Sequence, residues 1–285
     1  MLLADTGVHA DIVANAVREA DSDRYLSALY APESKRTALL SLYAFNAEIA
    51  GVRDRIREAL PGEIRLQWWH DVLDRDVERS PDGHPIAEAL LETIAQYNLP
   101  GSAFENYLEA RMFDLYDDPM PSRGDLEGYC GETASTIIQL SSLILDPEGA
   151  ARSASCAGHA GCAQAITGLL RSLPAHRARG QCYVPRDILD SAGTTREEFL
   201  AIDNVPAAQR AIAAMIALAT EHFSAFRAGA RDLPDSLRPA FLPVALVPAY
   251  LRKLSAKGLD VMRERTDLSP LSRHWRLLIA ASRGW

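Results

Sequence analysis

Two clusters of carboxylates have a spacing that could bind a divalent cation. Asp114, Asp117 and Asp118 lie in the run DLYDDP, where positions i, i+3 and i+4 converge on one helical face and offer the oxygen ligands that Mg²⁺ prefers. Pro119 ends such a helix at once, so carboxylates that cap a loop are the alternative interpretation. The second cluster, for which a solvated helix face is the alternative, consists of Asp71, Asp74, Asp76 and Glu78.

Nucleophilic, nucleotide-binding and zinc chemistry have little support in the sequence. GxSxG, GxGxxG and P-loop lysine motifs are absent. The run Cys156-x-x-His159-x-x-Cys162 has the residue types of a zinc site, but residues six apart on a helix lie about 240° around its axis, so only two of the three share a face. None of the four cysteines forms a CxxC pair, and we expect reduced thiols rather than a disulfide framework.

Charge is distributed unevenly along the chain. Its 285 residues include 30 Lys and Arg against 38 Asp and Glu, and this net charge of −8 argues against a nucleic-acid partner. Residues 149–186 nevertheless contain five arginines and no acid, and residues 252–285 contain eight cations and three acids. This asymmetry indicates an anionic ligand, an anionic membrane surface or an acidic partner, with a merely dipolar surface as the alternative. Arg177 and Arg179 are the candidate anion-binding residues.

The sequence predicts neither an export signal nor a membrane span. Residues 1–14 lack the basic start and long apolar core of a signal peptide, and also the Arg-rich character of a transit peptide. The longest apolar runs, residues 211–219 and 241–251, fall short of the roughly 18 residues that a spanning helix needs. We expect a cytoplasmic protein, with peripheral attachment to the inner membrane as the alternative location.

Long proline-free segments predict the elements that hold these residues. In the first segment apolar residues from Ala38 to Ile56 recur at a spacing of three and four, which is typical of one helical face, and Pro61-Gly62 is expected to end that helix. Hairpin dipeptides between alternating runs are absent. The sequence therefore predicts an all-α fold of about ten helices in a single domain, residues 1–285. The segments are 33–60, 101–118, 122–146, 148–173 and 207–233.

Three blocks of sequence form a pattern that covers most of the chain. Residues 24–54 contain Tyr43-Ala44-Phe45 and Asp54, residues 111–136 contain Tyr129-Cys130, and residues 161–185 close in Gly180-x-x-Tyr183-x-Pro185. In order and spacing these blocks resemble the squalene/phytoene synthase family. The resemblance implies an isoprenoid-synthase-like helical bundle with a central cavity. In active members of that family, two prenyl diphosphates condense head to head on Mg²⁺.

The chain departs from the family's pattern at the positions that hold Mg²⁺. In the first motif this chain has Ala50 and Gly51 where the family has aspartates, and Asp54 is the only motif aspartate that is retained. In the second motif Ser172 and His176 replace the aspartates. One carboxylate cannot hold a cluster of Mg²⁺ ions, which need several oxygen ligands. The departures imply no catalytic residues, no metal and no cofactor. Mg²⁺ is expected only if an active synthase uses other ligands, such as Asp54, Asp114, Asp117 and Asp118.

The residues that replace the motifs resemble one branch of the family. Glu48-Ile49, RLQWW at 65–69 and the run Leu170-Arg171-x-x-Pro174-x-His176-x-x-Arg179 are similar to the branch that contains the mitochondrial assembly factor for respiratory complex I and its bacterial relatives. The resemblance implies a pseudoenzyme that supports assembly of that complex through a protein partner. The alternatives are an active head-to-head prenyl diphosphate synthase and a carrier of lipid or isoprenoid that docks on an anionic membrane.

Six residues are candidates for lining a pocket that binds an isoprenoid or lipid. For the aromatic ones, packing in an ordinary core is the alternative interpretation. Trp68 and Trp69 are adjacent and point about 100° apart on a helix, so at least one of them is expected at a surface or cavity mouth. The six candidates are Tyr43, Phe45, Asp54, Tyr129, Gln164 and Arg171.

Overall fold

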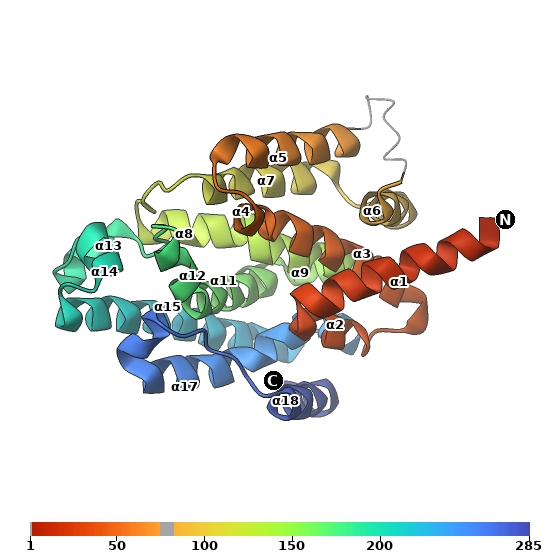
Figure 1. Cartoon of the computed structure of the whole chain (residues 1–285). Coiled ribbons are helices and arrows are strands. Elements are labelled where there is room, and N and C mark those ends of the chain that lie inside the picture. Colours follow the sequence, from red (N-terminus) through yellow and green to blue (C-terminus); the bar gives the residue numbers. More distant parts are fainter. Residues whose placement is uncertain (1, 75–82) are drawn as a thin grey trace. The chain divides into compact units, whose positions relative to one another are not determined.

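The described part of the chain is built from helices. The computed structural model describes residues 2–74 and 83–285, and within these ranges no strand is present, which confirms the predicted all-α class. Ten of the described helices have ten or more residues, and shorter ones connect them. In chain order the α-helices are α1 (Leu2–Ala20), α2 (Ser22–Ala28), α3 (Glu33–Ala50), α4 (Val52–Arg55), α5 (Ala59–Leu73), α6 (Pro85–Tyr97), α7 (Gly101–Met112), α8 (Arg123–Cys130), α9 (Thr136–Leu145), α10 (Pro147–Arg152), α11 (Ala154–Arg171), α12 (Leu173–Ala178), α13 (Arg186–Ala192), α14 (Arg196–Ala201), α15 (Val205–Gly229), α16 (Arg238–Phe241), α17 (Val247–Lys257) and α18 (Pro270–Arg283) (Figure 1).

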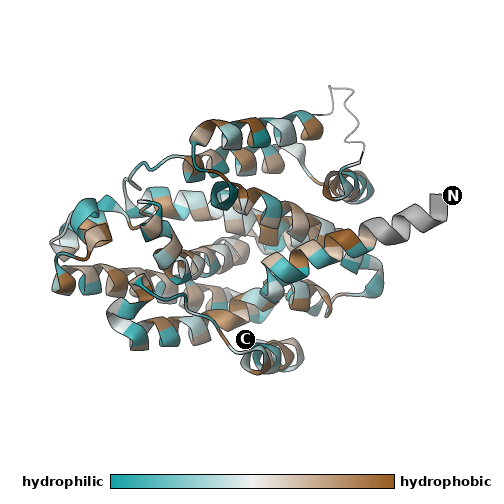
Figure 2. Ribbon diagram, viewed as in Figure 1, coloured by the Kyte–Doolittle hydropathy of each residue, from teal (hydrophilic) through white to brown (hydrophobic). Residues whose placement is uncertain are grey.

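These helices group into two compact units. Unit 1 comprises Met1–Leu115, Thr136–Ala154 and Leu233–Leu242, and unit 2 comprises Tyr116–Ser135, Ser155–Asp232 and Pro243–Trp285. Hydrophobic residues recur between hydrophilic ones along most ribbons, as the alternating brown and teal of Figure 2 show. This is the pattern expected of helices that each bury one face. The single-domain organisation stays a prediction.

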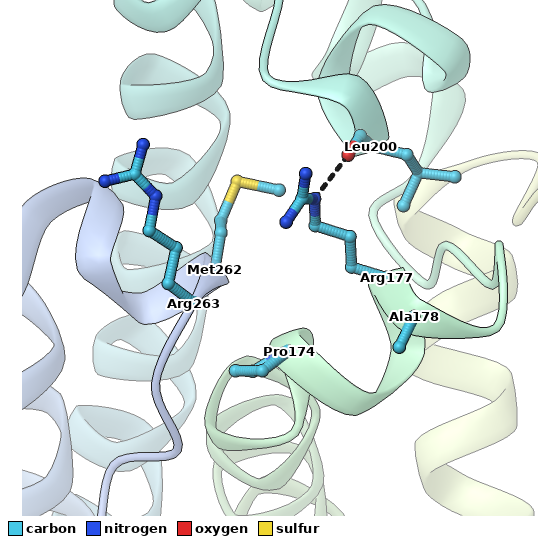
Figure 3. Close-up of a pocket in the computed structure, with 6 residues that line it drawn as sticks. All are labelled: Pro174, Arg177, Ala178, Leu200, Met262 and Arg263. Carbon is cyan, nitrogen blue, oxygen red and sulfur yellow. Dashed lines mark hydrogen bonds between the residues drawn. The ribbon is translucent and has the colours of Figure 1, made fainter.

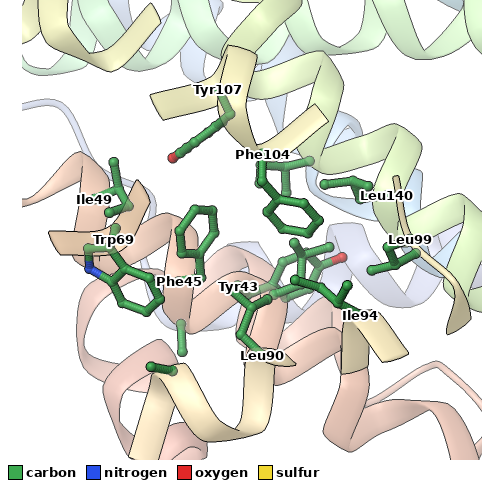
Figure 4. Packing of buried hydrophobic residues seen from close by; sticks show 14 of the residues in the cluster. Tyr43, Phe45, Ile49, Trp69, Leu90, Ile94, Leu99, Phe104, Tyr107 and Leu140 are labelled. Carbon is green, nitrogen blue, oxygen red and sulfur yellow. The ribbon is translucent and has the colours of Figure 1, made fainter. Parts of the chain in front are cut away.

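Helix α3 organises the core of unit 1. It packs against α1, α6, α7 and α9, and its buried side chains include Tyr43 and Phe45 (Figure 4). The ring centroid of Phe45 lies 5.0 Å from that of Trp69, 5.6 Å from that of Phe104 and 5.3 Å from that of Tyr107. Edge-on and tilted contacts of this kind stabilise aromatic pairs beyond the burial of their area. The predicted apolar stripe of this helix is therefore a well-packed core face.

A buried carboxylate joins α3 to α5. Glu48 is 6% exposed, and its Oε1 accepts hydrogen bonds from the Arg65 guanidinium and, at 3.4 Å, from the indole Nε1 of Trp69. The Nε2 atom of His84 lies 3.6 Å from the same oxygen, and Nδ1 of His84 accepts from the backbone N–H of Ala87 and so caps α6. A buried charge persists when it is paired and hydrogen-bonded. This group of side chains, the Glu48 cluster, therefore ties three helices of unit 1 together.

The chain turns earlier than its prolines predict. Helix α3 ends at Gly51, Ile56 is extended, and Pro61 and Gly62 lie in the first turn of α5, so the prediction that Pro61-Gly62 ends the first helix is wrong. Proline is tolerated there because the first N–H groups of a helix have no partner within it. A Cβ atom at Gly62 would lie 2.5 Å from a methyl carbon of Leu115, so an alanine there would require that side chain to shift.

In unit 2, two helical segments come into backbone contact. A Cβ atom added at Gly161 of α11 would lie 2.4 Å from the backbone nitrogen of Ser135 and 2.5 Å from its Cα. Ser135 ends a π-helical turn, Gly131–Ser135, and its hydroxyl donates to the carbonyl oxygen of Gly158 at 3.1 Å. Glycine at position 161 is therefore a packing requirement.

All four cysteines are buried and reduced, as predicted from the sequence. Burial raises the pKa of the Cys156 and Cys182 thiols to about 11. A high pKa disfavours the reactive thiolate, so these two residues pack as small apolar side chains.

Replacing Glu48 should destabilise the protein in proportion to the hydrogen bonds that are lost. We expect Glu48→Ala to lower the free energy of unfolding by about 3 kcal/mol, because it leaves buried donors without their acceptor. Glu48→Gln keeps one acceptor oxygen and should lose about half of that. Urea denaturation measures both, with the exposed Glu33→Ala on the same helix as the control. Equal stability of Glu48→Ala and wild type would contradict this role.

Two of the three glycines of α11 should respond oppositely to alanine. Gly161→Ala should lower the free energy of unfolding by about 2 kcal/mol, because the new methyl group meets backbone atoms that cannot move aside. A Cβ at Gly158 meets nothing within 4 Å, and Gly158→Ala should raise the free energy of unfolding by about 0.5 kcal/mol through its better helix propensity. Thermal melts of both variants decide; the same melting temperature for the two would refute the close contact.

Candidate functional site

The first motif lies at the end of α3 in unit 1. Ala50 is the last residue of the helix and Gly51 closes it, with its N–H bonded to the carbonyl oxygen of Ala47. Asp54 is exposed on the short helix α4. Before α3, Asp21 caps α2 and pairs with Arg24 at 2.6 Å. The acid there is thus used for the fold of α2.

Two candidate pocket residues of unit 1, Tyr43 and Phe45, are 1% and 0% exposed. The hydroxyl of Tyr43 accepts a hydrogen bond from Ser141 at 3.3 Å, and the Arg24 guanidinium lies 5.9 Å from the centre of its ring. Burial raises the pKa of Tyr43, although the bond from Ser141 opposes the change. Both side chains lie in the core cluster of Figure 4, and a ligand at either one stays a prediction.

Three aromatic rings from two of the sequence blocks meet in unit 2. The ring centroid of Tyr183 lies 4.8 Å from that of His176 and 5.9 Å from that of Tyr129. His176, at a second-motif position, is 8% exposed. Nearby in sequence, Gln164 on α11 has a buried Oε1 atom with no hydrogen-bond partner among the described residues. The structure thus brings Tyr129 together with His176 and Tyr183. It also leaves the side-chain oxygen of Gln164 as an acceptor that a ligand could use.

Arg171 belongs to a network that fixes the segment before α18. Its Nε donates to the carbonyl oxygen of Thr266 at 3.1 Å, its terminal nitrogen pairs with Asp267 at 3.1 Å, and its guanidinium lies 3.8 Å from the centre of the Tyr250 ring. Arg273 pairs with the same carboxylate at 3.0 Å. These contacts give Arg171 a structural task in unit 2.

A pocket of about 450 Å³ in unit 2 contains two arginines. Arg177 and Arg263 both line it, and Met262 lies between them (Figure 3). The Nε of Arg177 donates to the carbonyl oxygen of Leu200 at 2.5 Å, and Arg263 lies 3.9 Å from the carboxylate of Asp260. Arg179 is absent from the lining and donates to the side chain of Gln181 instead. An anion could therefore bind at Arg177, with Arg263 rather than Arg179 beside it.

The first acidic cluster does not form a shared helix face. Helix α7 ends at Met112, Asp114 lies in the following 3₁₀ turn and pairs with Arg111 at 3.0 Å, and Asp117 and Asp118 are exposed beyond it. The predicted i, i+3, i+4 helical face is wrong because the helix ends first. In the second cluster Asp71 accepts from Gln67, while Asp76 and Glu78 lie outside the described residues. In residues 2–74 and 83–285 no group of three or more His, Cys, Asp or Glu side chains could hold a metal ion.

A groove between α5 and α7 in unit 1 was not expected from the sequence. The two helices lie side by side (Figure 1). The groove has a volume of about 850 Å³. Leu60 and Ile64, each 63% exposed, contribute apolar surface one helical turn apart. Trp68 also lines the groove while Trp69 is fully buried, as their adjacency predicts. Carboxylates accompany this surface, at Glu63, Asp71, Glu105 and Glu109.

A second unexpected cluster lies in unit 2. The Nδ1 atoms of His159 and His222 are 3.1 Å apart, and Nε2 of His222 lies 3.0 Å from Glu127, which also pairs with Arg123 at 2.8 Å. Burial alone raises the pKa of Glu127, but hydrogen bonds from Arg123 and His222 outweigh it and lower the pKa overall. Sequence spacing does not reveal this group, since His222 is 63 residues from its partner His159.

The similarity of the chain to known proteins agrees with this arrangement. The model of the squalene/phytoene synthase family matches residues 17–274. The chain is 28% identical over 267 residues to NADH dehydrogenase (ubiquinone) complex I, assembly factor 6, of Bos taurus, with 91% of this chain and 80% of that protein covered. It is 26% identical over 267 residues to presqualene diphosphate synthase of Zymomonas mobilis, with 90% and 88% covered.

The fold matches solved structures as well. Squalene synthase HpnC from Alicyclobacillus acidocaldarius superposes with a TM-score of 0.75 at 22% identity, and covers 90% of this chain and 96% of that one. This likeness supports the isoprenoid-synthase helical fold expected from the resemblance. Because the family model covers nearly the whole sequence, the chain belongs to the squalene/phytoene synthase family.

Proposed function

We propose that this chain is a catalytically silent member of its family that supports assembly of respiratory complex I through a protein partner. One observation carries the proposal. Helix α3 ends in Ala50 and Gly51 where active members hold carboxylates, and Glu48, the acid nearest to them, is buried against Arg65 and Trp69. Of the residues that resemble the assembly-factor branch, Glu48, Ile49 and Trp69 are thus packed into the interior of unit 1. The similarity of the chain to relatives that are named as complex I assembly factors, at 28% and 27% identity, also supports the proposal.

The proposal includes the absence of a magnesium cofactor. Loss of a diphosphate group requires several carboxylates to hold the metal ions that neutralise its charge. In unit 1 only Asp54 remains of the first motif, and it is exposed. In unit 2 the second motif offers a hydroxyl at Ser172 and an imidazole at His176, whose ring packs against Tyr183. These side chains do not fit a cluster of Mg²⁺ ions.

The groove between α5 and α7 is the surface that we assign to the protein partner. Apolar side chains of Leu60, Ile64 and Met112 lie among carboxylates in the lining, and His70 is the one residue there that can carry positive charge. Such a surface complements a basic amphipathic segment, whose apolar face would bury Leu60 and Ile64. Arg177 and Gln164 in unit 2 remain the proposed contacts for an isoprenoid or lipid ligand. An assembly role also places the protein at the inner membrane as a peripheral protein.

Purified protein should not turn over prenyl diphosphates. Incubation with Mg²⁺ and farnesyl or geranylgeranyl diphosphate should release no pyrophosphate, because the carboxylates that neutralise the leaving group are missing. Presqualene diphosphate synthase of Zymomonas mobilis serves as the positive control under the same conditions. Release of pyrophosphate by this chain, abolished by Asp54→Asn, would establish the active synthase instead.

A charge in the groove should impair complex I assembly without unfolding the protein. Because Ile64 is already exposed, Ile64→Glu should leave the fold intact. It should weaken partner binding by about thirty-fold if Ile64 is a central contact. In a strain that lacks the gene, the variant should restore less complex I on native gels than the wild type does. Val205→Glu, at another exposed apolar residue, is the control. Full restoration by Ile64→Glu would exclude the groove, and intact complex I in the deletion strain would exclude the assembly role.

A further inference from the structure

The C-terminal helix α18 exposes a continuous apolar stripe. Leu271 is 81% exposed, Trp275 62%, Leu278 49% and Ile279 38%. At about 100° per residue, these four side chains fall within an arc of about 100° on one face of the helix. Isolated exposed apolar residues are common on soluble proteins, but a stripe with this spacing marks a surface that contacts something else.

The opposite face of α18 holds the helix on unit 2. Leu277 and Ala280 are buried, and Arg273 pairs with Asp267 at 3.0 Å. The ring of Trp285, just beyond the helix, lies 5.0 Å from that of Phe226 on α15. Because these contacts fix the rotation of α18, the apolar stripe faces outward and cannot turn inward without breaking them.

The charges beside the stripe have one sign. Helix α18 contains three arginines and His274 but no acid. On a helical projection Arg276 and Arg283 follow one edge of the stripe, about 40–60° beyond Ile279, and His274 lies about 40° beyond Leu278 at the other edge. Cations beside an apolar stripe with a tryptophan are typical of a helix that lies in the plane of a bilayer, with anionic headgroups at its edges.

We propose that α18 is a membrane-surface helix whose stripe, Leu271, Trp275, Leu278 and Ile279, inserts into an anionic lipid bilayer. A soluble acidic partner would complement the cations at the edges of the stripe. It would not account for the four apolar residues at the centre of the exposed face, which a bilayer would bury. The helix lies on the bilayer: among residues 2–74 and 83–285, no helix is long and apolar enough to cross a membrane. The proposal does not depend on the assembly role or on inactivity.

Vesicle sedimentation tests the proposal with the full chain. The wild type should sediment with phosphatidylcholine vesicles that contain phosphatidylglycerol, much less with pure phosphatidylcholine, and less as NaCl is raised, because salt screens the attraction of the arginines. Leu278→Glu should weaken binding to the anionic vesicles by about tenfold or more, because a carboxylate replaces an inserted apolar group and repels the headgroups. Arg276→Gln combined with Arg283→Gln should reduce the difference between the two kinds of vesicle.

Val205→Glu is the matched control, because it makes the same kind of change at an exposed apolar residue outside α18 and should bind vesicles as the wild type does. Circular dichroism confirms that each variant is folded. Three results would overturn the proposal: no sedimentation of the wild type, equal sedimentation with both kinds of vesicle, or wild-type binding by Leu278→Glu. A dimer in solution that Leu278→Glu dissociates, without vesicle binding, would assign the stripe to a second copy of the chain and equally overturn it.

Discussion

Unit 1 depends on pairing the buried carboxylate of Glu48 with protein groups, because little water reaches it. A buried carboxylate needs a cation and hydrogen-bond donors in fixed positions, and here they come from other elements: Arg65 and Trp69 from α5, with His84 at the start of α6. Meeting this need fixes how α5 and α6 approach α3. The apolar packing follows from the same geometry, because Trp69 also contacts Phe45 in the centre of the core. One charged residue thus specifies positions that hydrophobic contacts alone would leave less defined.

The class of the fold could be predicted from local pattern, while its interruptions could not. The apolar spacing in residues 38–49 predicts the buried face of α3, since apolar residues on the buried face of a helix recur every three or four positions. Pro61 was a poor guide to the end of the first helix, because it lies inside the first turn of α5, where a missing N–H has no effect. The real break at Gly51 does have a local signal, because glycine commonly follows the last residue of a helix. The apolar spacing that continues to Val52 and Ile56 obscured this signal.

The candidate site was predictable in its residue types and much less so in its contacts. Tyr129, His176 and Tyr183 were each visible in blocks of the sequence, and the structure brings their rings together. Arg171 resembled a ligand contact, yet its carboxylate partner, Asp267, lies 96 residues further along the chain. The groove between α5 and α7 escaped notice because Leu60 and Ile64 have the spacing of an ordinary buried face. Sequence shows which side chains are apolar, but only the fold shows which of them remain uncovered.

The end of α3 also bears on how such a protein evolves. Aspartates at positions 50 and 51 would place negative charge at the C-terminal end of a helix, where the helix dipole disfavours it, and within one turn of the buried Glu48. In the catalytically silent protein that we propose, neither substitution would have a bound metal to offset its electrostatic cost. The end of α3 therefore favours uncharged residues at positions 50 and 51, independently of what the surface of the protein binds.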